Sequence, residues 1–179
     1  MTEKLEWLPA ADHAELLAPT VAEMAAQLTK DGATVEVAAI DATDADTEAF
    51  CARYGQPLDE SANCVVVAGK RGGVIKYAAC LVLATTRADI NGLVRRHLDV
   101  RKVSFAPLDE VVAATGMEYG GVTPLGLPAG WPVLIDAAVA AGEHLVIGSG
   151  LRRSKLLISG ATLAALPAAE VLDGLGVVR

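Results

Sequence analysis

Aromatic residues are scarce in this sequence: they make up 4% of the 179 residues, whereas hydrophobic residues as a whole make up 53%. The apolar residues are largely Ala, Val and Leu, so the core has to be built from many small aliphatic contacts and not from a few large rings. Such a composition favours the packing of helices against a sheet. The length allows one domain with a substantial core, and we expect a single domain over residues 1–179.

Long apolar segments and targeting signals are also missing. No apolar run approaches the roughly 18 residues that a helix needs to span a bilayer. The first residues, Met-Thr-Glu-Lys-Leu-Glu, do not combine a basic region with a following apolar stretch. We therefore expect a cytoplasmic protein with no membrane partner.

Cysteine occurs only at positions 51, 64 and 80, which are far apart and form no C-x-x-C pair. An odd number of cysteines at this spacing argues against a disulfide framework and against a structural zinc site. Cys80 is expected in the core. Cys64, which follows Asn63, is the one thiol whose environment could make it reactive.

The motifs of common enzymes are absent as well. There is no G-x-x-x-x-G-K-[ST], and Gly148-Ser149-Gly150 continues as Leu-Arg-Arg, unlike a dinucleotide-binding loop or a nucleophile elbow. The three histidines are scattered without metal-ligand spacing, so we expect no metal and no cofactor. Asp136 is the one acid inside an apolar strand-like segment, where a carboxylate needs hydrogen bonds.

Charge is distributed unevenly. Residues 1–60 hold 13 acidic and 3 basic residues, whereas residues 61–179 hold 9 acidic and 12 basic residues. Within residues 70–102 eight basic residues stand against two acidic ones, and Arg152, Arg153 and Lys155 follow later. If these side chains converge, they form an anion-binding face; the alternative is a solvated hairpin tip and helix surface.

Periodicity predicts mixed helices and strands without a strict βαβ alternation. Thr20 and Glu23 form a capping-box pattern, and Gly69–Gly73 predicts a hairpin turn. We expect residues 131–139 and 143–149 to pair as strands. The predicted helices are 20–30, 47–54, 89–98, 108–114, 161–166 and 168–172, and the other predicted strands are 33–40, 63–68, 74–84, 101–105 and 155–159. An α+β domain on a mixed, curved sheet is favoured over a doubly wound fold.

Residues 119–128, Tyr-Gly-Gly-Val-Thr-Pro-Leu-Gly-Leu-Pro, are the most informative stretch of the chain. Gly120 and Gly121 have no Cβ atoms to keep a ligand away from the backbone N–H groups, and Pro124 stiffens the far side. The segment predicts either a plain turn or a loop whose backbone binds a ligand.

In order along the chain, these pieces resemble the YbaK/EbsC family of aminoacyl-tRNA deacylases, which is related to the editing domain of bacterial prolyl-tRNA synthetases. The resemblance rests on the strand from Asn63, the hairpin, Gly120 and Pro124 as the family's G-x-x-x-P, the Val133–Asp136 segment and Gly148–Gly150. It implies a YbaK-like, barrel-like curved β-sheet flanked by helices. It also implies hydrolysis, in trans, of the ester of a mischarged tRNA at its acceptor end, with an aminoacyl-tRNA synthetase as a further partner and a monomer or homodimer as the assembly.

The resemblance further implies the residues of the site. Backbone groups replace a catalytic triad: Gly120 and Gly121 supply N–H groups or close approach, Thr123 a hydroxyl contact and Pro124 rigidity, with Asn63 as the fifth catalytic position. The implied substrate-binding residues are Tyr119, Val122, Gly126, Asp136, Ser149, Gly150 and Arg152.

The sequence departs from the family pattern at Asn63 or Ala62, where the family has a lysine. Asparagine offers hydrogen bonds but no charge. Arg152, Arg153 or Lys76 replaces the cation, or the substrate differs, or the chain no longer catalyses the reaction. The alternative hypotheses are therefore a non-catalytic module that binds an aminoacyl-adenosine or amino-acid-like ligand and thiol chemistry at Cys64.

Overall fold

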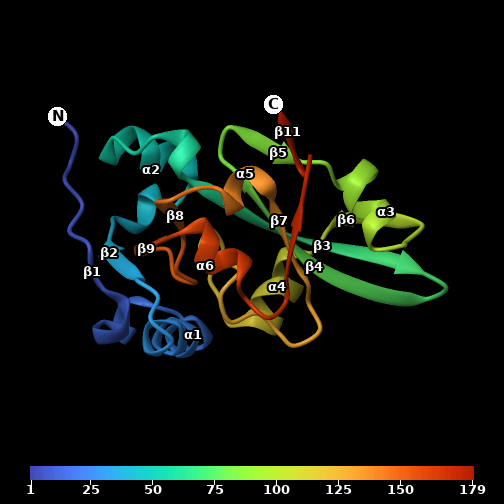
Figure 1. The fold of residues 1–179 in the computed structure, drawn as a ribbon, viewed down its shortest axis with the longest axis horizontal. Helices are drawn as coiled ribbons and strands as arrows, with labels where there is room; N and C mark the ends of the chain where they lie inside the picture. The colour runs from blue at the N-terminus through green and yellow to red at the C-terminus, as the bar shows by residue number, and fades with distance from the viewer.

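Two open β-sheets organise the chain in this computed structural model, which describes residues 1–179 (Figure 1). The five-stranded sheet has the order β10 (Ala169–Leu172), β7 (Val133–Asp136), β4 (Val74–Leu83), β3 (Ala62–Arg71), β6 (Lys102–Phe105). The four-stranded sheet has the order β1 (Leu8–Pro9), β2 (Glu36–Ala39), β9 (Ser154–Ile158), β8 (Leu145–Gly148). A separate pair joins β5 (Thr86–Ala88) to β11 (Gly176–Val178).

The hairpin of β3 and β4 is the longest feature of the fold and projects away from the rest of the molecule (Figure 1). Its antiparallel register runs from Ala62 opposite Leu83 to Arg71 opposite Val74. Only Gly72 and Gly73 remain in the turn, and both have positive φ, 57° and 80°. Two such residues match the twist of the strands, so the predicted hairpin is confirmed with a tighter turn than residues 69–73.

The α+β class is confirmed, but neither sheet closes into a barrel. β4 and β7 pair in parallel, as do β7 and β10, whereas β8 pairs antiparallel with β9 in the other sheet. The two sheets meet at one isolated bridge between Ser61 and Val146. Because a single bridge cannot continue the ladder, the barrel-like closure that we expected is not seen.

Six short helices lie around these sheets, together with single 3-10 turns and one π-helical turn. They are α1 (Pro19–Lys30), α2 (Thr47–Tyr54), α3 (Arg95–His97), α4 (Leu108–Thr115), α5 (Ala137–Ala140) and α6 (Gly160–Ala164). The turns are Ala10–Asp12, Ala14–Leu16, Ala42–Asp44, Leu58–Glu60 and the π-helical Ile90–Val94. The helix predicted over residues 89–98 is thus divided into a π turn and α3.

Local capping explains where α2 begins and ends. The Asp46 carboxylate accepts hydrogen bonds from the N–H groups of Glu48 and Ala49 at the first turn. Gly55, with φ of 68°, ends the helix and donates to the Cys51 carbonyl. The predicted boundaries of this helix are confirmed.

Helix α1 begins differently from the prediction. Ala18 is the residue before the first turn and offers no side-chain cap, and Pro19 occupies the first helical position, where a missing N–H costs nothing. The prediction that Thr20 and Glu23 form a capping box is therefore wrong, because both residues already lie inside the helix.

Two of the expected strand and helix assignments are wrong near the C-terminal end. β7 stops at Asp136, and α5 turns the chain so that β8 enters the four-stranded sheet, which means that residues 131–139 and 143–149 do not pair. Residues 169–172 form β10 and not a helix, because they pair in parallel with β7. The apolar pattern of so short a segment fits both a helix and a strand, and pairing with the neighbouring strand determines which of them forms.

The core is aliphatic, as the composition predicts. A cluster of 20 buried residues joins both sheets to α1, with Val37 and Leu156 from one sheet and Leu81 and Ile135 from the other. A second cluster of 9 lies between the five-stranded sheet and the π turn with α3. Phe50 is the one fully buried aromatic side chain, in a smaller cluster beside β8.

Candidate functional site

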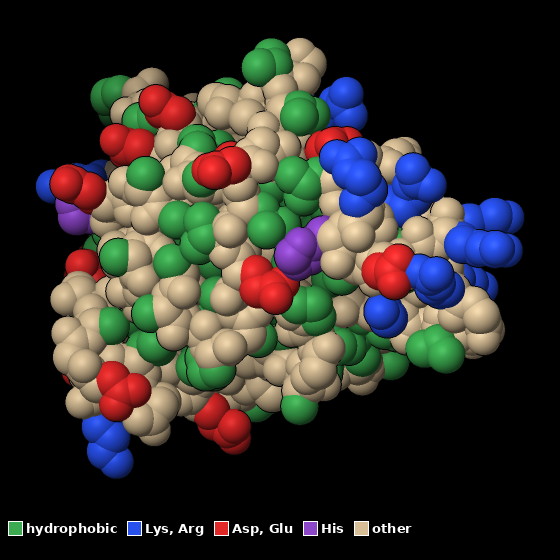
Figure 2. All heavy atoms as spheres, turned by 45° about the vertical axis from the view of Figure 1, so that its right-hand side comes forward, with side chains coloured by type: hydrophobic (Ala, Val, Ile, Leu, Met, Phe, Trp, Pro, Cys, Tyr) green, Lys and Arg blue, Asp and Glu red, His purple; other side chains and the backbone are tan.

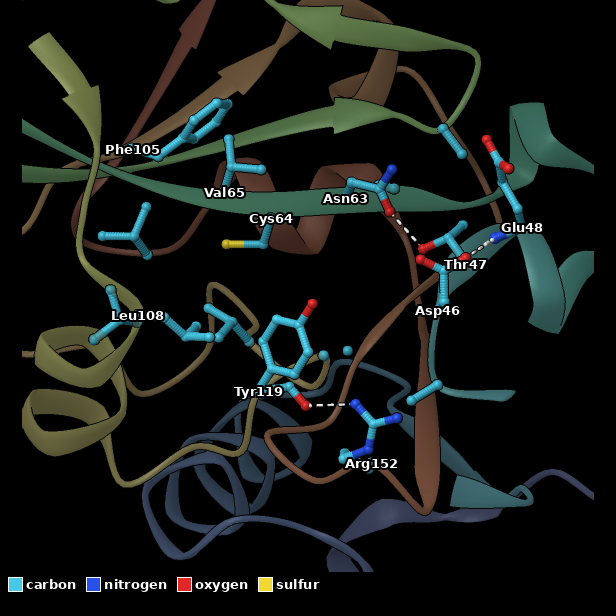
Figure 3. A pocket seen from close by; sticks show the side chains of 18 of the residues that line it. Asp46, Thr47, Glu48, Asn63, Cys64, Val65, Phe105, Leu108, Tyr119 and Arg152 are labelled. Carbon is cyan, nitrogen blue, oxygen red and sulfur yellow. Dashed lines mark hydrogen bonds between the residues drawn. The ribbon is translucent and has the colours of Figure 1, made fainter. Parts of the chain in front are cut away.

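A cleft of about 830 Å³ opens between the first half of β3 and the loop of residues 119–128, which we call the Gly120 loop (Figure 3). Its walls come from the start of α2, the start of β3, the end of β6 with α4, the Gly120 loop and the β8–β9 turn. The lining residues are Ala45–Glu48, Ala62–Val66, Ala84, Phe105, Ala106, Leu108, Val111, Tyr119, Gly120, Val122, Gly148, Arg152, Lys155 and Arg179. The volume lies within the usual range of ligand pockets.

One wall of the cleft is an unpaired strand edge. β6 pairs with β3 only over Val67–Lys70, and the N–H of Ala106 donates to the Val66 carbonyl just beyond this register. Backbone groups of alternate residues point to opposite sides of a strand. The N–H and C=O of Cys64 therefore point away from β4, toward the cleft, where no strand pairs with them.

The Gly120 loop is anchored by its second glycine. The Gly121 N–H donates to the Glu118 carbonyl, and the Gly121 carbonyl accepts from Gly150 at 2.7 Å. A Cβ on Gly121 would lie 2.8 Å from the backbone of Leu151. The absence of a side chain at Gly121 thus serves close packing within the chain, and its N–H is not available to a ligand.

Gly120 and Val122 differ from Gly121 in the hydrogen bonding of their backbone N–H groups. Both line the cleft, and the N–H of neither donates to another group of the chain. Gly120 has φ of 80°, a conformation that glycine adopts without strain. Free backbone donors beside a cleft can hold an anionic or carbonyl oxygen.

The Gly148–Gly150 turn supports the loop from behind. A Cβ on Gly148 would lie 2.7 Å from the carbonyl oxygens of Gly121 and Val122. Ser149 is fully buried, and its hydroxyl bonds within the turn, with Leu151 and Ser154. Among these residues only Gly148 lines the cleft.

Arg152 ties the Gly120 loop to the opposite wall. Its guanidinium donates to the Tyr119 carbonyl and to the Ala42 carbonyl, both at 3.0 Å, and its backbone N–H donates to the Glu118 carboxylate (Figure 3). The guanidinium carbon lies 5.8 Å from the centroid of the Tyr119 ring. This places a positive charge in the cleft beside the free N–H of Gly120.

Lys155 also lines the cleft, although the sequence named it only as one of three late basic residues and not as a site residue. It lies opposite Gly148 in the β8–β9 register, is 6% exposed, and donates from Nζ to the Ala45 carbonyl at 2.8 Å. Burial lowers the pKa of its ammonium to about 8. The available signal was a lysine at the start of an apolar strand, Lys-Leu-Leu-Ile, where a charge is costly.

Asn63 lies at the end of the cleft where α2 begins. Its Oδ1 accepts a hydrogen bond of 2.6 Å from the Thr47 hydroxyl (Figure 3). Of the cations proposed as substitutes for the missing lysine, Arg152 lines the cleft, while Arg153 and Lys76 bond to the carbonyls of Glu15 and Leu98 elsewhere.

The Cys64 side chain points into the cleft (Figure 3). Burial raises the pKa of its thiol, with a smaller contribution from Cys80. The thiolate is the reactive form, so this environment disfavours nucleophilic chemistry at neutral pH.

Several predicted site residues do not line the cleft. Thr123 is fully buried with an unpartnered hydroxyl, and a Cβ on Gly126 would meet the Thr20 carbonyl oxygen at 2.4 Å. Asp136 is buried at the end of β7 beside Gly176. The predicted positions outside the lining are Gly121, Thr123, Pro124, Gly126, Asp136, Ser149 and Gly150; those inside it are Asn63, Tyr119, Gly120, Val122 and Arg152.

Clusters of metal ligands and membrane-spanning helices are both absent from the molecule. No group of three or more His, Cys, Asp or Glu side chains is placed to hold a metal ion. None of the helices has the length and apolar character required to cross a membrane. No histidine lines the cleft. Its polar groups are those of the backbone and of the basic, asparagine and hydroxyl side chains, and its acids are Asp46 and Glu48.

The fold is that of an α+β protein with a cleft lined by backbone groups, cations and hydroxyls. Residues 42–166 match the family model described as aminoacyl-tRNA editing domain. The match spans more than half of the chain, and the chain belongs to this family. The resemblance drawn from the sequence is thereby confirmed.

Solved structures show the same fold. A candidate trans-editing enzyme for prolyl tRNA synthetase is 22% identical with a TM-score of 0.71, covering 88% of this chain and 97% of that one. The hypothetical protein APE2540 is 21% identical with a TM-score of 0.73, covering 85% and 97%. A candidate signal transduction protein from Marinobacter aquaeolei VT8 is 19% identical with a TM-score of 0.54, covering 87% of this chain and 30% of that one. At these identities the likeness concerns the fold alone.

Proposed function

We propose that the chain is a trans-acting deacylase that hydrolyses the ester of a mischarged aminoacyl-tRNA. The observation that carries the proposal is the pair of free backbone N–H groups, of Gly120 and Val122, in a cleft of a protein that belongs to the editing-domain family. The volume of about 830 Å³ suits an amino acid esterified to a nucleoside.

The chemistry that this arrangement supports is attack by water on the ester carbonyl carbon. The water oxygen bonds to that carbon, the bond from the carbon to the ribose oxygen breaks, and the ribose oxygen takes up a proton. The products are the free amino acid and the uncharged tRNA. Backbone donors directed at the developing oxyanion stabilise the transition state, by about 2.7–4 kcal/mol per donor in other enzymes.

The cations of the cleft have a separate role in this proposal. Lys155 uses one hydrogen bond, to Ala45, which leaves two N–H donors, and Arg152 lines the same cleft. Together they are the groups that hold the phosphate or ribose of the terminal nucleotide, in place of the lysine that Asn63 replaces. An associated synthetase is part of the proposal as the source of the mischarged tRNA.

A panel of mischarged tRNAs, including Cys-tRNA(Pro) and Ala-tRNA(Pro), tests the reaction with purified protein. We expect release of the amino acid from at least one member well above the spontaneous rate. Lys155→Met should lower that rate, while Lys30→Met, at the exposed end of α1, should not. Spontaneous rates for every member would refute the proposal.

The uncharged Asn63, held by Thr47, favours a second candidate function: a module that binds an aminoacyl-adenosine or amino-acid-like ligand without hydrolysis. Calorimetry with an amide-linked aminoacyl-adenosine, which cannot be hydrolysed, separates the two. Binding of this analogue without hydrolysis of any tRNA, and a gain of hydrolysis in Asn63→Lys, would establish the second function.

A further inference from the structure

A second groove, of about 790 Å³, lies beside the cleft and is lined by basic side chains. Four of its lining residues are cations and one, Glu110, is an acid. The cations come from three parts of the chain: Lys70 from β3, Lys102 at the start of β6 with Arg101 directly before it, and Arg95 from α3. We call this set the basic groove.

These cations stand out against the charge of the whole protein, which is −7. Figure 2 shows Lys and Arg side chains gathered at the end of the molecule where the β3–β4 hairpin and α3 lie, while acidic side chains are spread over the rest. Lys70, Arg101 and Lys102 are exposed and form no ion pair within the chain. The expected convergence is therefore present in part: four of the eight basic residues of 70–102 line this groove. Arg71 instead pairs with Asp99, and Arg152 and Lys155 line the separate cleft.

Strand pairing sets the spacing of the basic groove. Lys70 lies opposite Lys102 in the β3–β6 register, and the Arg101 N–H donates to the Lys70 carbonyl at 3.0 Å. Three cations are thus fixed on two adjacent strands at one end of the ladder. A polyanion with regularly spaced charges suits such a row better than a single small anion.

Phe105 connects the basic groove to the cleft. It lies three residues beyond Lys102, about 10 Å along β6, and it lines both hollows. Its side chain is 64% exposed, although burial of a large ring is favourable. An exposed aromatic ring beside cations is the arrangement on which proteins stack unpaired bases.

We propose that the basic groove binds the phosphate backbone of an RNA acceptor stem and that Phe105 stacks a base of its unpaired 3′ end, which then enters the cleft. The proposal rests on the proposed function, because it names the surface that positions the substrate of that reaction. Glu110 is the one acid among the groove's lining residues, against four cations, and its carboxylate accepts a hydrogen bond of 2.8 Å from the Tyr77 hydroxyl.

Binding of an uncharged RNA hairpin with an unpaired 3′ end tests the surface without any chemical step. We expect the double variant Arg101→Ala/Lys102→Ala to weaken binding at least tenfold, measured by fluorescence anisotropy. The slope of log K against log salt should fall by about 0.9 for each duplex phosphate that the variant no longer neutralises. Lys30→Ala, which removes an exposed lysine on α1, is the matched control and should bind like the wild type.

The role of Phe105 has its own readout. Phe105→Ala should weaken binding of the hairpin with the unpaired end by roughly 5- to 150-fold, as for the loss of one stacked base. It should leave binding of a blunt hairpin of the same stem unchanged. An equal effect on both probes would overturn the stacking assignment.

The outcomes separate this proposal from the deacylase proposal. If no mischarged tRNA is hydrolysed but the groove variants weaken RNA binding, the RNA-binding surface is supported and the deacylase proposal is refuted. If tRNA is hydrolysed and the groove variants bind RNA and hydrolyse tRNA like Lys30→Ala, the RNA-binding surface is refuted and the deacylase proposal is supported. Equally tight, groove-dependent binding of polyglutamate would also overturn RNA as the partner.

Discussion

Replacement of Lys155 by methionine removes a buried charge from the cleft while keeping the length of the side chain. Lys155 is 6% exposed, and its ammonium has one hydrogen-bond partner, the Ala45 carbonyl. Burial lowers the pKa of this ammonium from 10.5 to about 8, although Cys51 and Asp46 act in the opposite direction. The charge therefore opposes folding at neutral pH.

The two pKa values set both the size and the direction of the effect. In the unfolded chain Lys155 titrates at the ordinary 10.5, so between pH 8 and 10.5 the unfolded state binds a proton that the folded state has released. The free energy of unfolding of the wild type consequently rises with pH over this window through Lys155. At ~1.4 kcal/mol per pKa unit, the separation of the two values is worth about 3 kcal/mol.

Urea unfolding of the wild type and of Lys155→Met, at a series of pH values from neutral to 10.5, measures this difference. We expect the free energy of unfolding of the variant minus that of the wild type to fall by about 3 kcal/mol as pH rises through the window. Taking the difference cancels the titrations of groups that do not interact with Lys155, including Cys64 and Cys80, whose pKa values burial raises. Cys51 interacts with Lys155, so the experiment is done in a Cys51→Ala background.

Lys30→Met is the control, because Lys30 is exposed at the end of α1. Its difference from the wild type should not change over the same pH range. A difference for Lys155→Met that is constant with pH would refute the reasoning, since it would mean that the ammonium is as well solvated in the folded protein as in the unfolded chain.

Asp46→Ala removes the cap of α2 and should lower the free energy of unfolding by about 1 kcal/mol, seen as a lower Tm; an unchanged Tm would contradict the capping. Gly148→Ala places a Cβ against the Gly120 loop and should destabilise the protein by about 1–3 kcal/mol and lower deacylation. Gly72→Ala strains the hairpin turn, where φ is 57°, but adds no contact within 4 Å and should keep deacylation, so equal activities of these two variants would count against the support role of Gly148. Cys64 should resist a thiol reagent near neutral pH in the folded protein and react after denaturation, and Cys64→Ala should keep deacylation; rapid labelling of the folded protein would contradict the raised pKa.

The parts of the fold that were predictable depend on local chemistry. The hairpin followed from Gly72 and Gly73, whose positive φ angles suit a two-residue turn. Helix α2 was predicted over residues 47–54, and the structure shows that Asp46 and Gly55 cap its two ends. The strand β10, Ala169–Leu172, was missed because four residues of mixed character adopt whichever state their neighbours stabilise, and here β7 pairs with them.

The candidate site was also predictable only in part. The Gly120 loop was found from its glycines and prolines, and it does line the cleft through Tyr119, Gly120 and Val122. The sequence could not distinguish Gly120, with its free N–H, from Gly121, whose N–H is bonded to Glu118. The loop conformation that makes this bond packs against Gly150 and Leu151, which lie far along the chain.

By itself the sequence determined an α+β protein with an aliphatic core, a tight hairpin, a glycine-rich loop and a basic stretch at residues 70–102, because each of these depends on residue type and short-range spacing. Only the tertiary structure decided which strands pair, that the sheets stay open, that Lys155 lies buried in the cleft and that Lys70, Arg101 and Lys102 share one groove. Burial, and the pKa shifts that follow from it, arise from residues distant in the chain, and no local pattern encodes them.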